Sequence, residues 1–161
     1  MVKREESEMV SVPLNDVVRQ VVSLFNREAI IRGIRVETFL TDDLPNVNID
    51  TVQIQQVLTN LMMNAAESMI QEGRDRKISI RTEAGGGRRA RVAVSDTGTG
   101  IEVKDIGKIF DPFFTTKRSG LGMGLSLSRS IIEAHGGRMG VENNTGKGAT
   151  FYFDLPAGEG A

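Results

Sequence analysis

Asn60-Leu61-Met62-Met63-Asn64 and, further along the chain, Asp96-Thr97-Gly98-Thr99-Gly100 are the most informative stretches of this sequence. Residues four apart share one face of a helix, so the first stretch places two side-chain amides next to each other. The second places a carboxylate at a turn whose glycines permit tight backbone geometry. Gly120-Leu121-Gly122-Met123-Gly124-Leu125 adds a glycine-rich segment before a predicted helix. Together the three stretches indicate a nucleotide pocket.

The composition is that of one globular domain. A chain of 161 residues is long enough for a single core, and 39% hydrophobic and 25% charged residues are ordinary values. A formal net charge of −1 gives no electrostatic reason to expect nucleic acid as a partner. The absence of cysteine excludes disulfides and thiolate metal sites. No stretch is long and apolar enough to span a bilayer, and the charged start is no signal peptide. We therefore expect a cytoplasmic domain without direct membrane contact, whether or not its parent protein is membrane-anchored.

The first part of the chain alternates strands with an amphipathic helix. Met9 to Pro13 alternates like a short strand, and Ile34 to Leu40 is a second predicted strand. Between them lies a helix that Asn15 or Asp16 is expected to cap and that Gly33 ends. The apolar face predicted for this helix consists of Val17, Val18, Val21, Val22, Leu24 and Phe25.

Two further helices contain the amides and follow the glycine-rich segment. Asp50 or Thr51 is expected to cap the first of them, which contains Asn60 and Asn64. The other runs from about Leu121 to His135, where Gly136-Gly137 ends it. Apolar residues at helical spacing in the amide-bearing helix are Ile54, Val57, Leu58, Leu61, Ala65 and Met69.

The remaining strands are predicted to form hairpins. Ile78 to Glu83 and Arg89 to Ser95 flank Gly85-Gly86-Gly87, with Ile78, Ile80, Val92 and Val94 facing inward. Arg138 to Glu142 and Thr150 to Leu155 form a final hairpin. Hairpins favour an α+β two-layer α/β sandwich over a doubly wound parallel sheet, so we expect a mixed sheet of about five strands covered on one face by about three helices. The ordered domain is expected to span residues 9–156, between a flexible segment 1–8 and a frayed tail 157–161.

Each candidate stretch also has a plain structural interpretation. Asn60 and Asn64 offer oxygen to magnesium and nitrogen to phosphate without adding negative charge, but solvated or capping amides explain them equally well. A buried Asp96 could accept a hydrogen bond from an exocyclic amine such as that of adenine, although such stretches are often Asx turns. Gly120 to Gly124 resembles a phosphate cradle at a helix N-terminus. It is neither a Walker loop, because no Gly-Lys-Ser/Thr follows, nor a dinucleotide fingerprint, because no strand immediately precedes it.

Two more segments are ambiguous by themselves. Phe110-Asp111-Pro112-Phe113-Phe114-Thr115-Thr116-Lys117-Arg118 is an aromatic patch that runs into a polar, basic segment. It is either a loop held by core aromatics or a hinged lid whose Lys117 or Arg118 reaches phosphate. Thr145 to Phe151 alone indicates no more than a hairpin turn.

In this order, the stretches resemble the sequence boxes of the catalytic, ATP-binding domain of sensor histidine kinases, whose superfamily also contains DNA gyrase B, Hsp90 and MutL. The resemblance runs from about Ser11 to Pro156 and implies a Bergerat-type ATP-binding fold. The short interval between Phe114 and Gly120 resembles the short-lid kinases of nitrogen and dicarboxylate signalling. The boxes are an asparagine box at Asn60 to Asn64, a first glycine box at Asp96 to Gly100, a phenylalanine box at Phe110 to Phe114, a second glycine box at Gly120 to Gly124, and a glycine-threonine element at Gly146 to Phe151.

The resemblance implies a role for each matching residue. Asp96 would bind the adenine amino group, Gly98 and Gly100 would shape the adenine pocket, and Thr150 would contact adenine through water. Asn64 would hold Mg²⁺ and Asn60 would support the phosphate side, so that Asn60, Asn64 and Lys117 would be the catalytic residues and ATP and Mg²⁺ the cofactors. The phosphates would be bound by Lys117 and by the amides of Gly122 to Leu125. The nucleotide-binding residues would include the whole segment of Gly120, Leu121, Gly122, Met123, Gly124 and Leu125.

Two classes of activity compete, phosphoryl transfer to histidine and nucleotide hydrolysis. In the hydrolytic relatives and in anti-sigma serine kinases, a glutamate four residues before the magnesium asparagine acts as general base. This chain has Asn60 there, which cannot accept a proton. A neutral imidazole is already a nucleophile at pH 7, so the sequence favours a protein-histidine kinase. Glu67 is the nearby substitute base, but a surface charge explains it better. A binding module without transfer would require altered boxes, and these boxes are intact.

The phosphoacceptor is expected elsewhere. His135 is the only histidine of the chain and lies at a predicted helix end, which it is expected to cap. The resemblance therefore implies a histidine-bearing dimerisation domain of the same parent protein as partner, and a cognate response regulator as an indirect one.

Overall fold

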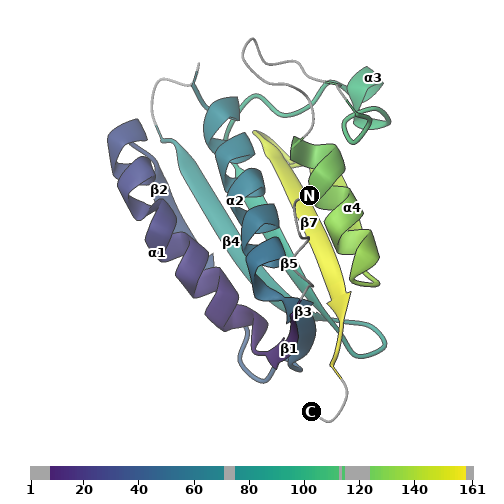
Figure 1. Ribbon diagram of the computed structural model, residues 1–161. Coiled ribbons are helices and arrows are strands. Elements are labelled where there is room, and N and C mark those ends of the chain that lie inside the picture. The colour runs from purple at the N-terminus through teal and green to yellow at the C-terminus, as the bar shows by residue number, and fades with distance from the viewer. Residues whose placement is uncertain (1–7, 71–74, 113, 115–123, 159–161) are drawn as a thin grey trace, which may run out of the picture.

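The chain folds into a helical layer on one face of a mixed sheet, as the computed structural model shows for residues 8–70, 75–112, 114 and 124–158 (Figure 1). Helices α1, α2 and α4 lie side by side across this face, and α3 lies at the end drawn at the top. The elements in chain order are β1 (Met9–Val12), α1 (Leu14–Arg32), β2 (Arg35–Phe39), β3 (Val47–Asp50), α2 (Thr51–Ser68), β4 (Lys77–Gly85), β5 (Arg89–Asp96), α3 (Val103–Ile106), α4 (Gly124–Ala134), β6 (Arg138–Asn143) and β7 (Ala149–Pro156).

The main sheet has five strands in the order β2-β4-β5-β7-β6. The β2 and β4 strands are parallel, whereas the other neighbouring pairs are antiparallel, which confirms the expected mixed sheet. The β1 and β3 strands pair antiparallel in a separate two-stranded sheet. Neither β3 nor the short helix α3 was expected from the sequence.

The core lies between the sheet and the helices. Ile78 and Ile80 of β4 and Val92 and Val94 of β5 are buried, as their alternation predicted. They pack under α2, which buries a continuous stripe at helical spacing. The fully or nearly fully buried residues of α2 are Ile54, Val57, Leu58, Leu61, Met62, Ala65 and Ala66.

Helix α1 differs in two details from the expected pattern. Pro13 occupies the N-cap position without a side-chain capping bond. Asn15 lies inside the first turn, donates to the Thr41 carbonyl at 2.9 Å and accepts from the Thr82 hydroxyl at 2.8 Å, so it joins elements instead of capping the helix. Leu24 is 78% exposed because it lies about 90° from the centre of the buried stripe.

Other predicted boundaries are confirmed. Gly33 ends α1 in the left-handed conformation, with φ of 66° and its N–H directed at the last carbonyls of the helix. Asp50 caps α2, because its carboxylate accepts from the Gln53 N–H at 3.1 Å. The β4–β5 hairpin turns between Gly85 and Arg89.

The chain stays hydrogen-bonded past the expected boundary at Pro156. Ala157 donates its N–H to the Arg88 carbonyl at 2.8 Å, and Gly158 donates to the Asn46 carbonyl at 2.7 Å. Ala157 also forms an isolated bridge with Val47. These two residues therefore join the β4–β5 turn to the small sheet instead of fraying.

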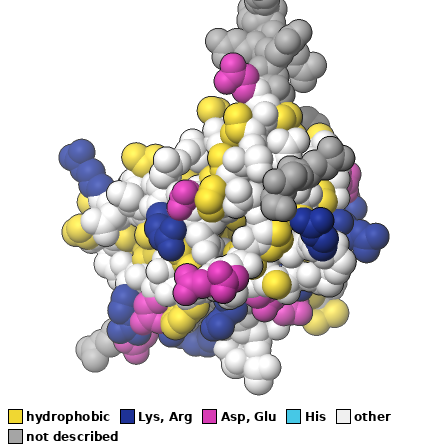
Figure 2. All heavy atoms as spheres, turned by 90° about the horizontal axis from the view of Figure 1, so that it is seen from below, with side chains coloured by type: hydrophobic (Ala, Val, Ile, Leu, Met, Phe, Trp, Pro, Cys, Tyr) yellow, Lys and Arg dark blue, Asp and Glu magenta, His cyan; other side chains and the backbone are white. Residues whose placement is uncertain are grey.

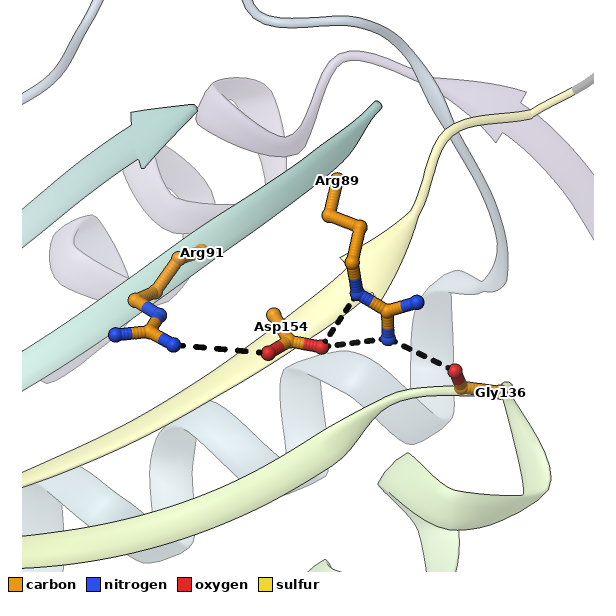
Figure 3. A network of polar contacts seen from close by, with 4 residues as sticks. All are labelled: Arg89, Arg91, Gly136 and Asp154. Carbon is orange, nitrogen blue, oxygen red and sulfur yellow. Dashed lines mark hydrogen bonds and ion pairs between the residues drawn. The ribbon is translucent and has the colours of Figure 1, made fainter. Parts of the chain in front are cut away.

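An ionic network ties the last strand to its neighbours (Figure 3). Asp154 accepts from the Nε and Nη2 of Arg89 at 2.9 and 2.6 Å, and Arg91 lies 3.8 Å from its other oxygen. Arg89 also donates to the Gly136 carbonyl at 2.9 Å. Because Gly136 follows α4, this network connects β5 and β7 to the turn before β6.

At the end of the molecule opposite α3, basic and acidic side chains are interspersed over the surface (Figure 2).

Candidate functional site

One face of α2 connects two parts of the molecule through residues four apart, Asn60, Asn64 and Ser68. Asn60 donates its side-chain N–H to the hydroxyl of Ser128, which is fully buried on α4, at 3.2 Å. Ser68 lies against the glycine turn, where its carbonyl accepts from the Thr99 N–H at 3.4 Å. Asn64, which is half-buried, therefore lies one helical turn from the residue that contacts α4, Asn60, and one helical turn from the residue that contacts the glycine turn, Ser68.

Asp96 supplies a buried carboxylate at the end of β5, where it is 3% exposed. Its Oδ1 accepts from the Gly98 N–H at 2.9 Å, which is the Asx-type bond considered from the sequence. The same oxygen accepts from the Ala149 N–H at 3.3 Å. The carboxylate is therefore held by the glycine turn on one side and by the start of β7 on the other.

Two glycines allow backbone to approach this site closely. A Cβ atom on Gly98 would lie 2.4 Å from the Ser68 hydroxyl and 2.6 Å from the Ser68 carbonyl oxygen, so only glycine lets the turn contact α2. Gly148 has a φ of 85°, and a Cβ there would lie 1.9 Å from the Asp96 carbonyl oxygen. Gly100, with φ of 75°, completes the turn.

The Thr150 side chain bonds two other polar side chains of the protein. Its hydroxyl lies 2.6 Å from that of Ser95, its partner across the β5–β7 ladder, and donates to the Asn144 side-chain oxygen. Because successive strand residues point to opposite faces, Thr150 lies on the sheet face away from the helices, whereas Ala149 lies on the face of Asp96. The residue that contacts the carboxylate is thus Ala149, through its N–H, and the expected water-mediated contact of Thr150 with adenine stays a prediction.

Asn143 and Asn144 were not recognised from the sequence as site residues. Asn144 donates to the Asp96 carbonyl at 3.0 Å and to the Lys147 carbonyl at 3.1 Å. Asn143 bonds both backbone groups of Ile101, accepting at 2.8 Å and donating at 2.7 Å. Two asparagines before a glycine also fit an ordinary turn, so the sequence contained no signal that separated these roles.

The expected phosphate-binding residues are described in part. Helix α4 begins at Gly124, which is exposed, and Leu125 is half-buried. Lys117 and the segment 120–123 lie outside the described residues. Phe110, in the predicted aromatic patch, packs edge-on against Phe151 with ring centres 6.2 Å apart, and the Arg129 guanidinium lies 5.5 Å from its ring centre. Phe110 is therefore a core anchor of this segment.

His135 is a structural residue with both ring nitrogens engaged. Its Nδ1 lies 2.8 Å from the Ile131 carbonyl oxygen, and its Nε2 accepts from the Asp50 N–H at 3.1 Å. A carbonyl can only accept and an N–H can only donate, so the proton lies on Nδ1. His135 is 9% exposed, caps α4 as expected, and also links this helix to the start of α2.

Three further observations concern the rest of the described chain. A shallow hollow of about 500 Å³ between α1 and α2 is lined by Arg19, Gln20, Ser23, Leu24 and Gln55, none of which is an expected site residue. Within the described ranges, no cluster of three His, Cys, Asp or Glu side chains could hold a metal ion. The helices in those same ranges include none that is long and apolar enough to cross a membrane.

Sequence comparison places this geometry in a known group. Residues 49–159 match the family described as "Histidine kinase-, DNA gyrase B-, and HSP90-like ATPase". The sensor protein FixL of Bradyrhizobium diazoefficiens is 44% identical over 158 residues, which are 98% of this chain and 31% of FixL. The chain spans about a third of the length of the curated relatives it matches.

Solved structures give the same result. The catalytic domain of the histidine kinase ThkA is 37% identical, with a TM-score of 0.82 over 92% of this chain and 95% of that domain. Full-length ShkA in complex with AMPPNP is 29% identical, with a TM-score of 0.82 over 96% of this chain and 32% of ShkA. ThkA in complex with the response regulator TrrA aligns at 34% identity and a TM-score of 0.79, over 93% of this chain and 42% of that chain.

Proposed function

Since this chain belongs to the histidine kinase-, DNA gyrase B- and HSP90-like ATPase family, we propose that it is the ATP-binding catalytic domain of a sensor histidine kinase. It would bind Mg-ATP and donate the γ-phosphoryl group to a histidine on a dimerisation domain of the same parent protein. The observation that supports this most directly is the buried carboxylate of Asp96, bonded by a glycine turn that lies against Ser68 on the same α2 face as Asn60 and Asn64.

Asp96 is suited to adenine in particular. An ionised carboxylate only accepts hydrogen bonds, so Asp96 is a chemical match for a ligand group that donates them. Adenine presents an amino group at its C6 position, whereas guanine presents an oxygen that would face the carboxylate with like polarity. Asp96 would therefore select ATP over GTP.

Asn64 would provide a neutral oxygen ligand for magnesium. Mg²⁺ prefers oxygen ligands and is often held jointly by the protein and by substrate phosphates, whose charge it neutralises. The position of Asn64 between α4 and the glycine turn fits this role, because α4 begins beside the glycine-rich segment proposed to bind phosphates. Lys117 and the backbone N–H groups of residues 120–125 would hold the phosphates themselves.

Transfer to histidine is favoured over hydrolysis because the α2 face has no general base at residue 60. Asn60 hydrogen-bonds Ser128 and cannot take a proton from water. In the transfer, the bond between the γ-phosphorus and the bridging oxygen of ADP breaks, and a phosphorus–nitrogen bond forms at the unprotonated nitrogen of the attacking imidazole. Its other ring nitrogen then releases its proton to water. The acceptor is not His135, whose nitrogens are both engaged. ThkA was solved with a response regulator, and we propose a cognate regulator as the next acceptor here.

Asp96→Asn tests this function with little disturbance of the fold. The asparagine oxygen can still accept from the N–H groups of Gly98 and Ala149, but the second oxygen becomes a donor. Isothermal titration of both proteins with Mg-ATP and Mg-GTP should show strong ATP preference in the wild type and its loss in the variant. Equal ATP affinities would contradict the assignment of Asp96. Rapid hydrolysis by the wild type, without label transfer to the parent's histidine-bearing domain, would contradict the kinase.

A further inference from the structure

We propose that Asn143 and Asn144 are positioning residues that hold the adenine loop, defined as residues 96–101, in the conformation that recognises adenine. This inference rests on the proposed function and extends it to residues at the end of β6 and in the turn that follows. Asn144 bonds the first residue of the loop, Asp96, and Asn143 bonds the last one, Ile101. The two adjacent side chains, from the last residue of β6 and the first residue of the turn to β7, thus fix both ends of the loop.

The orientation of the Asn144 amide follows from its partners. The carbonyl oxygens of Asp96 and Lys147, at 3.0 and 3.1 Å, can only accept, so the amide nitrogen must face them. The amide oxygen is left to accept the proton of the Thr150 hydroxyl. Because Thr150 gives its proton to Asn144, its oxygen must accept from the Ser95 hydroxyl at 2.6 Å.

This chain of bonds acts on Asp96 from two directions. Thr150 bonds the side chain of Ser95, the residue before Asp96 in β5. Asn144 bonds the carbonyl of Asp96 itself. Asn144 also holds the carbonyl of Lys147, shortly before Ala149 donates to the Asp96 carboxylate. A displacement of the β6–β7 turn would therefore move the carboxylate and its donor together.

Asn143 contributes a different contact, because its side-chain amide imitates a paired strand. It accepts from the N–H and donates to the carbonyl of Ile101, so both backbone groups of that residue are satisfied. Gly100 lies directly before Ile101, and a Cβ there would lie 2.9 Å from the Asn143 oxygen. The loop end is therefore packed against this side chain as well as bonded to it.

The test compares Asn144→Ala and Asn143→Ala with Thr145→Ala, whose wild-type side chain is exposed in the same turn. Affinities for Mg-ATP and Mg-GTP are measured by titration calorimetry on the whole chain, and unfolding is followed in urea. Loss of hydrogen bonds of ordinary strength should lower ATP affinity about tenfold in the two asparagine variants. GTP affinity should change little, so that the ATP-to-GTP ratio falls, whereas Thr145→Ala should leave this ratio unchanged.

A purely structural role would lower the free energy of unfolding without changing the ratio of the two affinities, and that result would overturn the proposal. Thr150→Val serves as a second probe, because it keeps the side-chain volume and removes the hydroxyl that bonds Asn144. It should lower the ratio less than Asn144→Ala, and the two effects should not add in the double variant. If Asn144→Ala does not fold, an unchanged ratio in Thr150→Val and Asn143→Ala overturns the inference. A wild-type chain without ATP preference would overturn the proposed function itself.

Discussion

Replacement of Gly148 by alanine should damage the carboxylate site more than any change in fold stability explains. Gly148 has φ of 85°, and a Cβ atom there would lie 1.9 Å from the carbonyl oxygen of Asp96 and 2.8 Å from its Oδ1. Real Cβ atoms essentially never lie closer than 3.0 Å to such atoms, so the two segments must separate by about 1.1 Å. The obstacle is backbone, which cannot rotate away as a side chain can.

Two contributions to the cost can be estimated. A non-glycine residue at positive φ costs about 1–2 kcal/mol. A separation of about 1.1 Å would also break the 3.3 Å bond from the Ala149 N–H to Asp96, and a hydrogen bond to a charged group contributes about 1.5–3 kcal/mol. The free energy of unfolding should therefore fall by about 2.5–5 kcal/mol, whereas a typical domain has about 5–15 kcal/mol.

Gly146→Ala is the matched control for backbone strain. Gly146 also has positive φ, 100°, but nothing lies within 4 Å of the Cβ position. The control should lose only about 1–2 kcal/mol of unfolding free energy and keep its ATP affinity. The difference between the two variants isolates the close approach of Gly148 to Asp96.

Urea unfolding and titration with Mg-ATP decide the outcome. If about 2 kcal/mol of the loss falls on the binding site, the ATP affinity of Gly148→Ala should drop about thirtyfold relative to Gly146→Ala. Affinities of the two variants within threefold of each other would refute the link between this turn and adenine binding. Equal losses of unfolding free energy would refute the clash.

Two other changes test the chemistry and the histidine. Asn60→Glu should raise ATP hydrolysis by about 10²-fold or more, because general-base catalysis is typically worth about 10²–10⁴-fold, and should not improve transfer to the parent's histidine-bearing domain. Phosphate release measures hydrolysis, and label transfer measures the kinase reaction. Unchanged hydrolysis would contradict the role of residue 60. His135→Ala should lower the free energy of unfolding by about 1–3 kcal/mol, since the Asp50 N–H loses its acceptor. Neither the wild type nor His135→Ala should acquire acid-labile label from γ-labelled ATP, and labelling that depends on His135 would show that it is an acceptor.

Local sequence patterns predicted most of the helices and strands, because residues close together in the sequence determine where these elements begin and end and which face is buried. Period-two alternation gave the buried faces of β4 and β5, and Asp50 and Gly33 bound their helices as their chemistry requires. Elements that depend on distant partners were missed. The β3 strand has four residues and pairs with β1 across the whole of α1. Asparagine is a residue type favoured at helix N-caps, yet Asn15 bonds Thr82, which lies 67 residues away.

The candidate site likewise contains some residues that local patterns predicted and others that depend on contacts distant in the sequence. The sequence patterns predicted Asp96 and the α2 amides as site residues, and the structure brings their elements together through contacts of Ser68 with the glycine turn. Thr150 and Ala149 lie on opposite faces of the sheet, and spacing in the sequence does not decide which of the two faces Asp96, because a shift of one residue reverses the side. Asn143 and Asn144 act on backbone groups 42 and 48 residues away, and no spacing rule reveals such contacts.

The site is therefore supported by two separate sets of contacts, with different consequences for nucleotide recognition. Asp96 and the adenine loop are fixed by the β6–β7 turn, through bonds to Asn143, Asn144 and Ala149. Of the α2 amides, Asn60 is fixed from another element, since it bonds the buried Ser128 of α4. Disturbance of the first set should change which base is bound, because the carboxylate moves relative to the purine. Disturbance of the second should change phosphate chemistry while the preference between ATP and GTP stays the same, because α4 directly follows the glycine-rich segment in the sequence. The two sets meet through α2, where Asn60 and Ser68 lie two turns apart on one rigid helix.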